Sequence, residues 1–230
     1  MPLPQLNPDT PEFPKVGSAA KDPNGLLAMG GDLSPALLME AYSRGIFPWY
    51  DQDSPILWWS PDPREVVLPN QQHWSKSMRK MRKETDLTLT TDTVFEEVIT
   101  ACARQEDPLR WVTEEMIDAY IELHRLGYAH SLEVWQQSEL VGGLYGVAIG
   151  AAFCGESMFH STSNASKFAF LTLADTLFDC GFHLIDCQFE TEHLRSLGSC
   201  SIARSKYIDQ LTLAQPVKIE WPGTFAPILR

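Results

Sequence analysis

A glycine-rich apolar stretch, ELVGGLYGVAIGAAFCGESMF, constrains the fold of this chain more than any other segment. It spans residues 139–159 and carries two apolar runs, which is typical of strands that are buried inside a sheet. The second run ends in one carboxylate, Glu156, and serines, a histidine and an asparagine follow it. Such a carboxylate either interacts with a helix start or a lysine, or it lies at the mouth of a pocket. For Glu156 considered alone, the first interpretation is favoured.

The remaining segments predict a mixed sheet with helices packed on it. Strands are expected in VVLP, LTLTTD, HSLEVWQ and HLIDCQF, and apolar residues recur at helical spacing in residues 92–105, 113–127 and 164–181, before a short closing helix around residues 204–211. Up to about residue 62, loops rich in proline, glycine and aromatic residues surround one helix, which is bracketed by Ser34 and Gly45. We therefore predict an α+β chain with a small N-terminal domain at residues 1–62 and a larger mixed-sheet domain at residues 63–230.

The composition is that of an ordinary globular protein, with 44% hydrophobic and 21% charged residues. No apolar window approaches the ~18 residues of a membrane span, and the N-terminus lacks the pattern of a signal peptide, so we expect a cytoplasmic protein. The five cysteines include no C-x-x-C pair, which indicates neither a disulfide framework nor a zinc site. They are expected to be buried thiols.

Charge is distributed unevenly along the chain. The formal net charge is -12, from 30 acidic and 18 basic residues, and a field of this sign disfavours non-specific binding to nucleic acid. The run KSMRKMRK nevertheless holds five cations and no acid: Lys76, Arg79, Lys80, Arg82 and Lys83. A solvated helix face is the ordinary interpretation. A local patch that docks on the phosphates of one region of a nucleic acid is the alternative.

An acid and an amide alternate in LIDCQ, at residues 184–188. In a strand, Asp186 and Gln188 would point to the same face. The amide oxygen of Gln188 could accept a hydrogen bond from a substrate amine, and Asp186 could orient and polarise that amide. The polar side of an edge strand is the favoured interpretation of this segment alone. Glu156 on a neighbouring strand shifts the balance toward a functional site.

Large aromatic residues crowd the loops of the N-terminal part, where Trp49, Tyr50, Trp58 and Trp59 occur, and Trp111 precedes a predicted helix. Core packing is the default for tryptophan, and a lid over an apolar or planar ligand is the alternative. The sequence contains no phosphate-binding loop, and the G-G-x-x-G run at residues 142–146 lacks the context of a dinucleotide fingerprint. ATP and NAD are therefore not expected.

Seven motifs occur in order along the chain: GLLAMGGDLSPALLMEAYSRGIFPWY, LWWSPDPR, HSLEVW, VGGLYGVAIG, GESMF, NASK and LIDCQ. Together they closely resemble the bacterial leucyl/phenylalanyl-tRNA–protein transferases, over about residues 13 to 208. The resemblance implies a small N-terminal domain followed by a domain of the acetyltransferase-like (GNAT) fold. It also implies the transfer of Leu or Phe, and less readily Met, from aminoacyl-tRNA to the N-terminal Arg or Lys of acceptor proteins, which marks them for degradation by the N-end rule.

The resemblance further implies where the site lies. The family's catalytic relay falls on Asp186 and Gln188, with Glu156 helping to arrange it. The pocket for the donor side chain is expected to be lined by Leu144, Phe153, Met158 and Ile185. Trp49 and Trp111 are expected near the terminal adenosine or the acceptor peptide, and the basic run corresponds to the family's patch for the tRNA acceptor stem.

No metal or nucleotide cofactor is expected, and we expect a monomer. Two positions depart from the family pattern: His160 stands where a serine is usual and is expected to perturb the charge of Glu156, and Leu144 stands where a methionine can line the pocket. An acetyl-CoA-dependent acetyltransferase is the competing enzyme, but its glycine-rich pyrophosphate turn is not found at a strand–helix junction. A non-catalytic tRNA-binding module would explain the basic run but not the pair Asp186 and Gln188.

Overall fold

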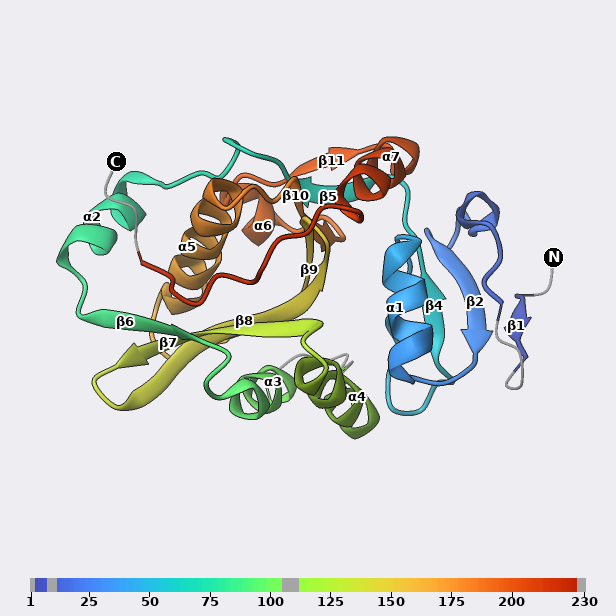
Figure 1. Ribbon diagram of the computed structural model, residues 1–230, viewed down its shortest axis with the longest axis horizontal. Helices are drawn as coiled ribbons and strands as arrows, with labels where there is room; N and C mark the ends of the chain where they lie inside the picture. Colours follow the sequence, from blue (N-terminus) through green and yellow to red (C-terminus); the bar gives the residue numbers. More distant parts are fainter. Residues whose placement is uncertain (1–2, 8–11, 105–111, 227–230) are drawn as a thin grey trace.

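A computed structural model describes residues 3–7, 12–104 and 112–226 (Figure 1). Two sheets occur in this part of the chain, and the smaller has the strand order β1-β2-β4-β3. Its strands are β1 (Gln5–Leu6), β2 (Leu26–Gly30), β3 (Phe47–Pro48) and β4 (Leu57–Trp59), with the 3₁₀ helix η1 (Val16–Ser18) before β2. The helix α1 (Pro35–Ser43) begins as predicted, because the Ser34 hydroxyl accepts a hydrogen bond from the backbone N–H of Leu37. Gly45 follows its end with a φ of 71°.

The larger sheet has seven strands within the described residues, in the order β11-β5-β10-β9-β8-β7-β6. These strands are β5 (Arg64–Val67), β6 (Leu87–Thr91), β7 (Ala129–Gln136), β8 (Glu139–Ile149), β9 (Ala152–His160), β10 (Leu184–Gln188) and β11 (Cys200–Ile202). The pair β9 and β10 is parallel and the other pairs are antiparallel. The mixed sheet confirms the predicted α+β class.

Helices cover both faces of the larger sheet. They are α2 (Lys76–Glu84), α3 (Phe95–Ala103), α4 (Glu114–Arg125), α5 (Ala165–Asp179), α6 (Glu192–Ser196) and α7 (Arg204–Ala214). Figure 1 shows α5 on one side of β8 and the pair α3 and α4 on the other. Along β8, Leu144 packs in the core under α5, whereas Tyr145 and Val147 pack in the core under α3 and α4. This two-sided burial explains why the predicted strands are apolar along their whole length.

The two sheets share one apolar core. Tyr42 of α1 belongs to the same buried cluster as Val98 of α3 and Tyr145 of β8. Arg64, the first residue of the larger sheet, donates a hydrogen bond to the carbonyl of Gly45 at 3.2 Å. The domain boundary at residue 62 stays a prediction. Within the described ranges, no helix is long and apolar enough to cross a membrane.

The helix α5 begins without a side-chain cap. Asn164 occupies the position before it, but its side chain makes no capping hydrogen bond, because its backbone is left-handed with a φ of 66°. The prediction for the cysteines is only partly right. Burial of the thiols is confirmed for Cys102 and Cys154. It is wrong for Cys180, which is exposed because it follows the last turn of α5.

Candidate active site

The strands β9 and β10 are paired only where they begin. Their parallel register extends from Leu184 opposite Ala152 to Asp186 opposite Cys154, and β9 then continues to His160. Between Asp186 and Gln188 the pairing of β10 with β5 is irregular, and Gln188 has a φ of 63°. The two strands therefore diverge after Asp186, and a pocket lies between their separated ends.

This pocket has apolar walls and a polar end. Its apolar lining includes Leu144, Phe153, Met158, Phe170, Leu173 and Leu194, and its polar lining includes Glu156, Asp186 and Gln188. Three of the four predicted wall residues are therefore at the pocket. Ile185 is not among the lining residues, because its side chain is fully buried in the core under α5.

The pocket carboxylate Glu156 has only uncharged hydrogen-bond partners among the described contacts. Its Oε1 accepts from the Gln188 amide Nε2 at 2.8 Å, and its Oε2 accepts from the Tyr120 hydroxyl at 3.2 Å. Burial raises the pKa of Glu156 to about 7, and hydrogen bonds from Tyr42 and Tyr120 oppose this rise. Near neutral pH this carboxyl group is thus present in both protonation states.

In contrast, Asp186 is neutralised by a buried cation. Its two carboxylate oxygens accept from Arg64 Nε at 2.7 Å and Nη2 at 2.6 Å, and the Tyr207 hydroxyl donates to Oδ2 at 2.8 Å. The Arg64 guanidinium lies between the rings of Phe47 and Tyr207, at 4.7 and 4.6 Å from their centroids. Burial acts to lower the pKa of Arg64, but the charge of Asp186, the neighbouring Tyr207 and the hydrogen bond to Asp186 together outweigh it and raise that pKa.

The contact predicted between the Asp186 carboxylate and the Gln188 amide is replaced by another arrangement. Asp186 Oδ1 accepts from the backbone N–H of Gln188 at 2.9 Å, and the Gln188 amide donates to Glu156 instead. The left-handed backbone of Gln188 breaks the strand alternation on which the prediction depended. Asp186 thus fixes the backbone of the amide residue, and Glu156 fixes its side chain.

His160 does not lie near Glu156, contrary to the prediction. It is exposed at the end of β9, where its Nδ1 is 3.3 Å from the Ser166 hydroxyl. It lies four positions beyond Glu156 along the strand, which corresponds to about 13 Å. The charge of Glu156 is governed by burial and by the tyrosines.

The aromatic residues of the N-terminal part pack mainly as core. Tyr50, Trp58 and Trp59 are buried, which favours the core interpretation. Trp49 is half-buried and its ring contacts those of Trp59 and Phe189, each at 5.3 Å between centroids. Phe189 follows Gln188 directly, so Trp49 lies beside the polar end of the pocket without lining it. The predicted residue Trp111 lies outside the described residues.

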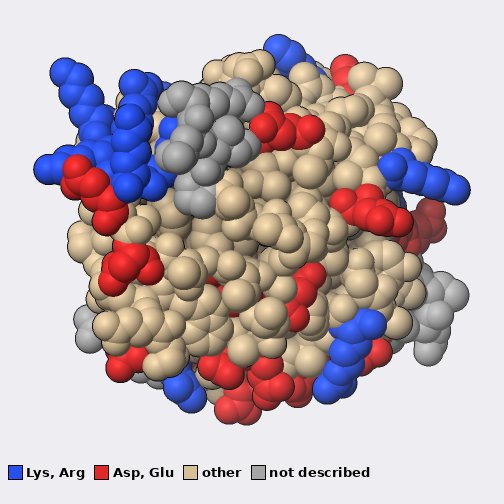
Figure 2. Space-filling model, turned by 60° about the vertical axis from the view of Figure 1, so that its left-hand side comes forward, with Lys and Arg blue, Asp and Glu red and all other residues tan. Residues whose placement is uncertain are grey.

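The basic run forms α2, and it presents cations on one side only. Lys76, Arg79, Lys80 and Lys83 are exposed, and Figure 2 shows Lys and Arg side chains gathered at the end of the molecule where α2 lies. Arg82 is buried instead, with its guanidinium over the Trp74 ring at 4.5 Å and 3.6 Å from Asp175 Oδ2. The assignment of Arg82 to the tRNA surface is wrong because helical spacing places it on the buried face with Met78.

Comparisons with known proteins identify the family. Residues 66–212 match the family model of leucyl/phenylalanyl-tRNA protein transferase, and residues 31–62 match that of its N-terminal domain. A leucyl/phenylalanyl-tRNA–protein transferase of Saccharophagus degradans is 51% identical over 223 residues, which cover 95% of this chain and 92% of that protein. This chain belongs to the leucyl/phenylalanyl-tRNA–protein transferase family. One from Pseudomonas fluorescens is 52% identical over 213 residues, covering 91% of this chain and 94% of the relative. The resemblance predicted from the motifs is confirmed, and the chain is a transferase.

Solved structures show partial likenesses. A GCN5-related N-acetyltransferase from Kribbella flavida has a TM-score of 0.40 at 14% identity, covering 74% of this chain and 61% of that one. A GCN5-related N-acetyltransferase-like protein from Streptococcus suis has a TM-score of 0.36 at 12% identity, covering 73% and 63%. These likenesses are too partial to decide whether the larger domain has the acetyltransferase-like fold, and that part of the fold stays a prediction.

Several site residues of this transferase were missed in the sequence. Arg64, Tyr120 and Tyr207 hold the acids of the pocket, and Phe170 and Leu173 form its wall on α5. The wall was detectable, because FAFLTLA is apolar on all sides of a helix and such helices are buried. The ion pair between Arg64 and Asp186 had no sequence signal, since 122 positions separate its partners. In the described part of the chain, no cluster of His, Cys, Asp or Glu is suited to hold a metal ion.

Proposed function

We propose that this transferase moves Leu or Phe, and less readily Met, from aminoacyl-tRNA to the N-terminal Arg or Lys of acceptor proteins. It acts as a cytoplasmic monomer in the N-end rule degradation pathway, without a metal or nucleotide cofactor. The observation that carries the proposal is the apolar pocket whose polar end is formed by Glu156 and Gln188. Family membership supports the same reaction.

The donor side chain occupies the apolar part of the pocket. Leu144, Phe153 and Met158 offer walls without hydrogen-bonding groups in their side chains, which suits Leu, Phe or Met. A β-branched side chain such as Ile or Val is wider next to the backbone and is excluded by shape. Discrimination of this kind amounts to a few kcal/mol at most, or about 1–3 kcal/mol per methylene group.

The reaction is the aminolysis of an ester. The neutral α-amine of the acceptor attacks the aminoacyl carbonyl carbon, a C–N bond forms, the C–O bond to the ribose breaks, and an amine proton ends on the ribose oxygen. A free α-amine has a pKa of about 7.7–8.0, so part of it is already neutral at pH 7 and only mild assistance is needed. The ester is already activated, so no ATP is consumed.

Gln188 is the group that receives the amine in this proposal. Its Nε2 is held by Glu156 at 2.8 Å and its backbone N–H by Asp186 at 2.9 Å, so its amide oxygen is oriented in advance. That oxygen accepts a hydrogen bond from the attacking amine. Asp186, already paired with Arg64, acts on Gln188 by positioning it.

The exposed face of α2 binds tRNA phosphates. Lys76, Arg79, Lys80 and Lys83 are all exposed on it, in a protein whose net charge is -12. Replacing these four by Ala should raise KM for Leu-tRNA and reduce the slope of log K against log salt by up to about 3. The control replaces four exposed cations elsewhere, Lys21, Arg125, Lys206 and Lys218, which changes the net charge equally. Equal effects of both variants would exclude α2 as the docking surface.

The transfer itself is tested with purified protein, labelled Leu-tRNA and a peptide that begins with Arg. We expect leucylated peptide without ATP, and no product from an otherwise identical peptide that begins with Gly. Acetylation of the Arg peptide from acetyl-CoA, without leucylation, would overturn the proposal in favour of an acetyltransferase.

A further inference from the structure

The C-terminal strap, residues 215–226, follows α7 and lies beyond the family match, which ends at residue 212. It returns across the larger sheet beside α5 (Figure 1). Its residues alternate, with Val217, Ile219 and Trp221 half-buried and the intervening Lys218 and Glu220 exposed. This alternation is that of an extended segment with one face packed on a core.

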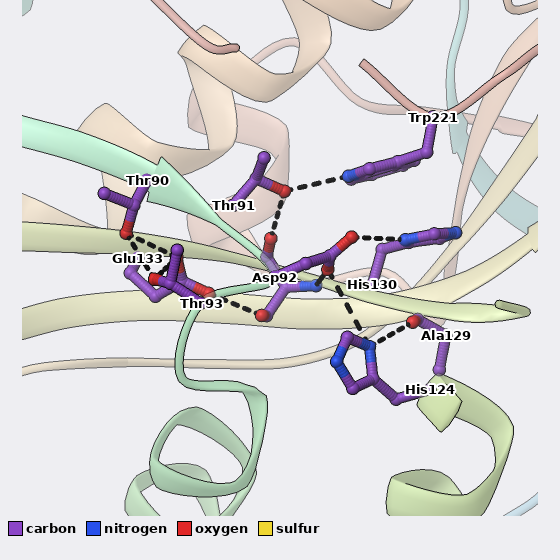
Figure 3. A network of polar contacts seen from close by, with 10 residues as sticks. Thr90, Thr91, Asp92, Thr93, His124, Ala129, His130, Glu133 and Trp221 are labelled. Carbon is purple, nitrogen blue, oxygen red and sulfur yellow. Dashed lines mark hydrogen bonds and ion pairs between the residues drawn. The ribbon is translucent and has the colours of Figure 1, made fainter. Parts of the chain in front are cut away.

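Trp221 attaches the strap to the sheet. Its ring stacks on the His130 imidazole at 4.3 Å with 7° between the planes, and its indole N–H donates to Thr91 Oγ1 at 2.8 Å (Figure 3). His130 is itself held, because its Nδ1 lies 2.8 Å from Asp92 Oδ2. The indole therefore has a fixed position and orientation.

The same indole packs against a wall of the donor pocket. The Trp221 and Phe153 rings lie 5.3 Å apart at 34°, and Phe153 lines the pocket while only 1% of it is exposed. On β8, a Cβ built on Gly146 would lie 2.5 Å from Phe153 Cζ, so the glycine leaves room for that ring and for nothing larger. The Phe153 ring is thus confined by Gly146 and by Trp221.

We propose that Trp221 is a positioning residue that sets the donor specificity of the transferase through Phe153. A pocket selects by shape only if its walls cannot yield, and the wall at Phe153 has the indole of Trp221 packed against it. Without the indole, Phe153 can move into the vacated space, and the pocket becomes larger. This inference rests on the proposed function, because it concerns the choice between Leu and Phe as the transferred residue.

The test measures kcat/KM for Leu and for Phe charged on one tRNA body, so that the tRNA contacts are equal. Trp221→Leu keeps an apolar side chain but removes most of the ring. We expect kcat/KM for Leu to fall about tenfold relative to that for Phe, since Leu loses wall contacts that the larger Phe retains. Trp221→Phe keeps a ring against Phe153 and should restore most of the wild-type ratio.

Val217→Ala is the matched control, because Val217 lies on the same face of the strap but packs against the cluster that contains Leu211 and Tyr207. It should lower the melting temperature and leave the ratio unchanged. A ratio that is unchanged in Trp221→Leu, or altered equally in Val217→Ala, overturns the inference. Absence of transfer by the wild-type protein would instead overturn the proposed function, so the two failures are distinguishable.

Discussion

Buried acids on the larger sheet have different surroundings, as two of their clusters show. In the pocket cluster, Glu156 and Asp186 lie where β9 and β10 diverge. In the edge cluster (Figure 3), the fully buried Glu133 of β7 accepts hydrogen bonds from the hydroxyls of Ser131 and Thr90, each at 2.5 Å, and of Thr93 at 3.0 Å. In both clusters the carboxylates accept hydrogen bonds, but the donors differ: a guanidinium, an amide and tyrosines at the pocket, and Ser and Thr hydroxyls at Glu133.

Strand pairing explains the difference. The register of β6 with β7 continues without interruption from Leu87 opposite Gln136 to Thr91 opposite Leu132. Thr90 is therefore held opposite Glu133 and its hydroxyl is directed at the carboxylate. At the pocket, the pairing of β9 with β10 ends after Asp186 and leaves a space between the two strands. Of these two clusters, we propose a role in transfer only for the one beside the separated strands.

The largest effect is expected from Asp186→Ala. It leaves the Arg64 guanidinium buried without its partner, which should reduce the free energy of unfolding by about 3–5 kcal/mol, and it frees the backbone of Gln188. Denaturant unfolding and the transfer rate measure both effects. Replacing the pair by apolar residues, Arg64→Met with Asp186→Leu, should restore stability but not transfer. Restored transfer would show that the pair does not position Gln188.

A smaller effect, dependent on pH, is expected at Glu156. Its pKa is raised from 4.5 to about 7 in the folded protein, so the folded state binds more protons between these values. Stability from this group is therefore fully present below about pH 4.5 and is lost as pH rises through 7, by about 3 kcal/mol at most. Glu156→Gln cannot ionise and should flatten the curve of unfolding free energy against pH. If the curve of unfolding free energy against pH is unchanged in Glu156→Gln, another group is responsible for the pH dependence.

The smallest of these effects is expected from Glu133→Gln in the edge cluster. Hydroxyl groups can turn to accept from the new amide, so the loss of stability should be about 1 kcal/mol, and the transfer rate should stay at the wild-type level. Thermal unfolding and the leucylation assay measure these quantities side by side. Lost transfer at retained stability would contradict the contrast between the two clusters.

Local interactions made part of this structure predictable. The first turns of α1 and α4 are predictable from Ser34 and Thr113. Their hydroxyls accept hydrogen bonds from the backbone N–H groups three residues later. The apolar runs in β8 and β9 predicted strands that are buried inside a sheet. Motif order predicted the family, and with it three residues of the pocket wall, Leu144, Phe153 and Met158.

The sequence by itself therefore determined most helices and strands around the larger sheet, their apolar faces and the acids Glu156 and Asp186 as candidates, because these depend on residues a few positions apart. Only the tertiary structure decided the partners of those acids. Arg64 and Tyr207 reach Asp186 from 122 and 21 positions away, and the bulge at Gln188 directs its amide to Glu156. Hydrogen bonding and the pKa of a carboxyl group depend on burial and on neighbours that meet only when strands from distant segments are aligned.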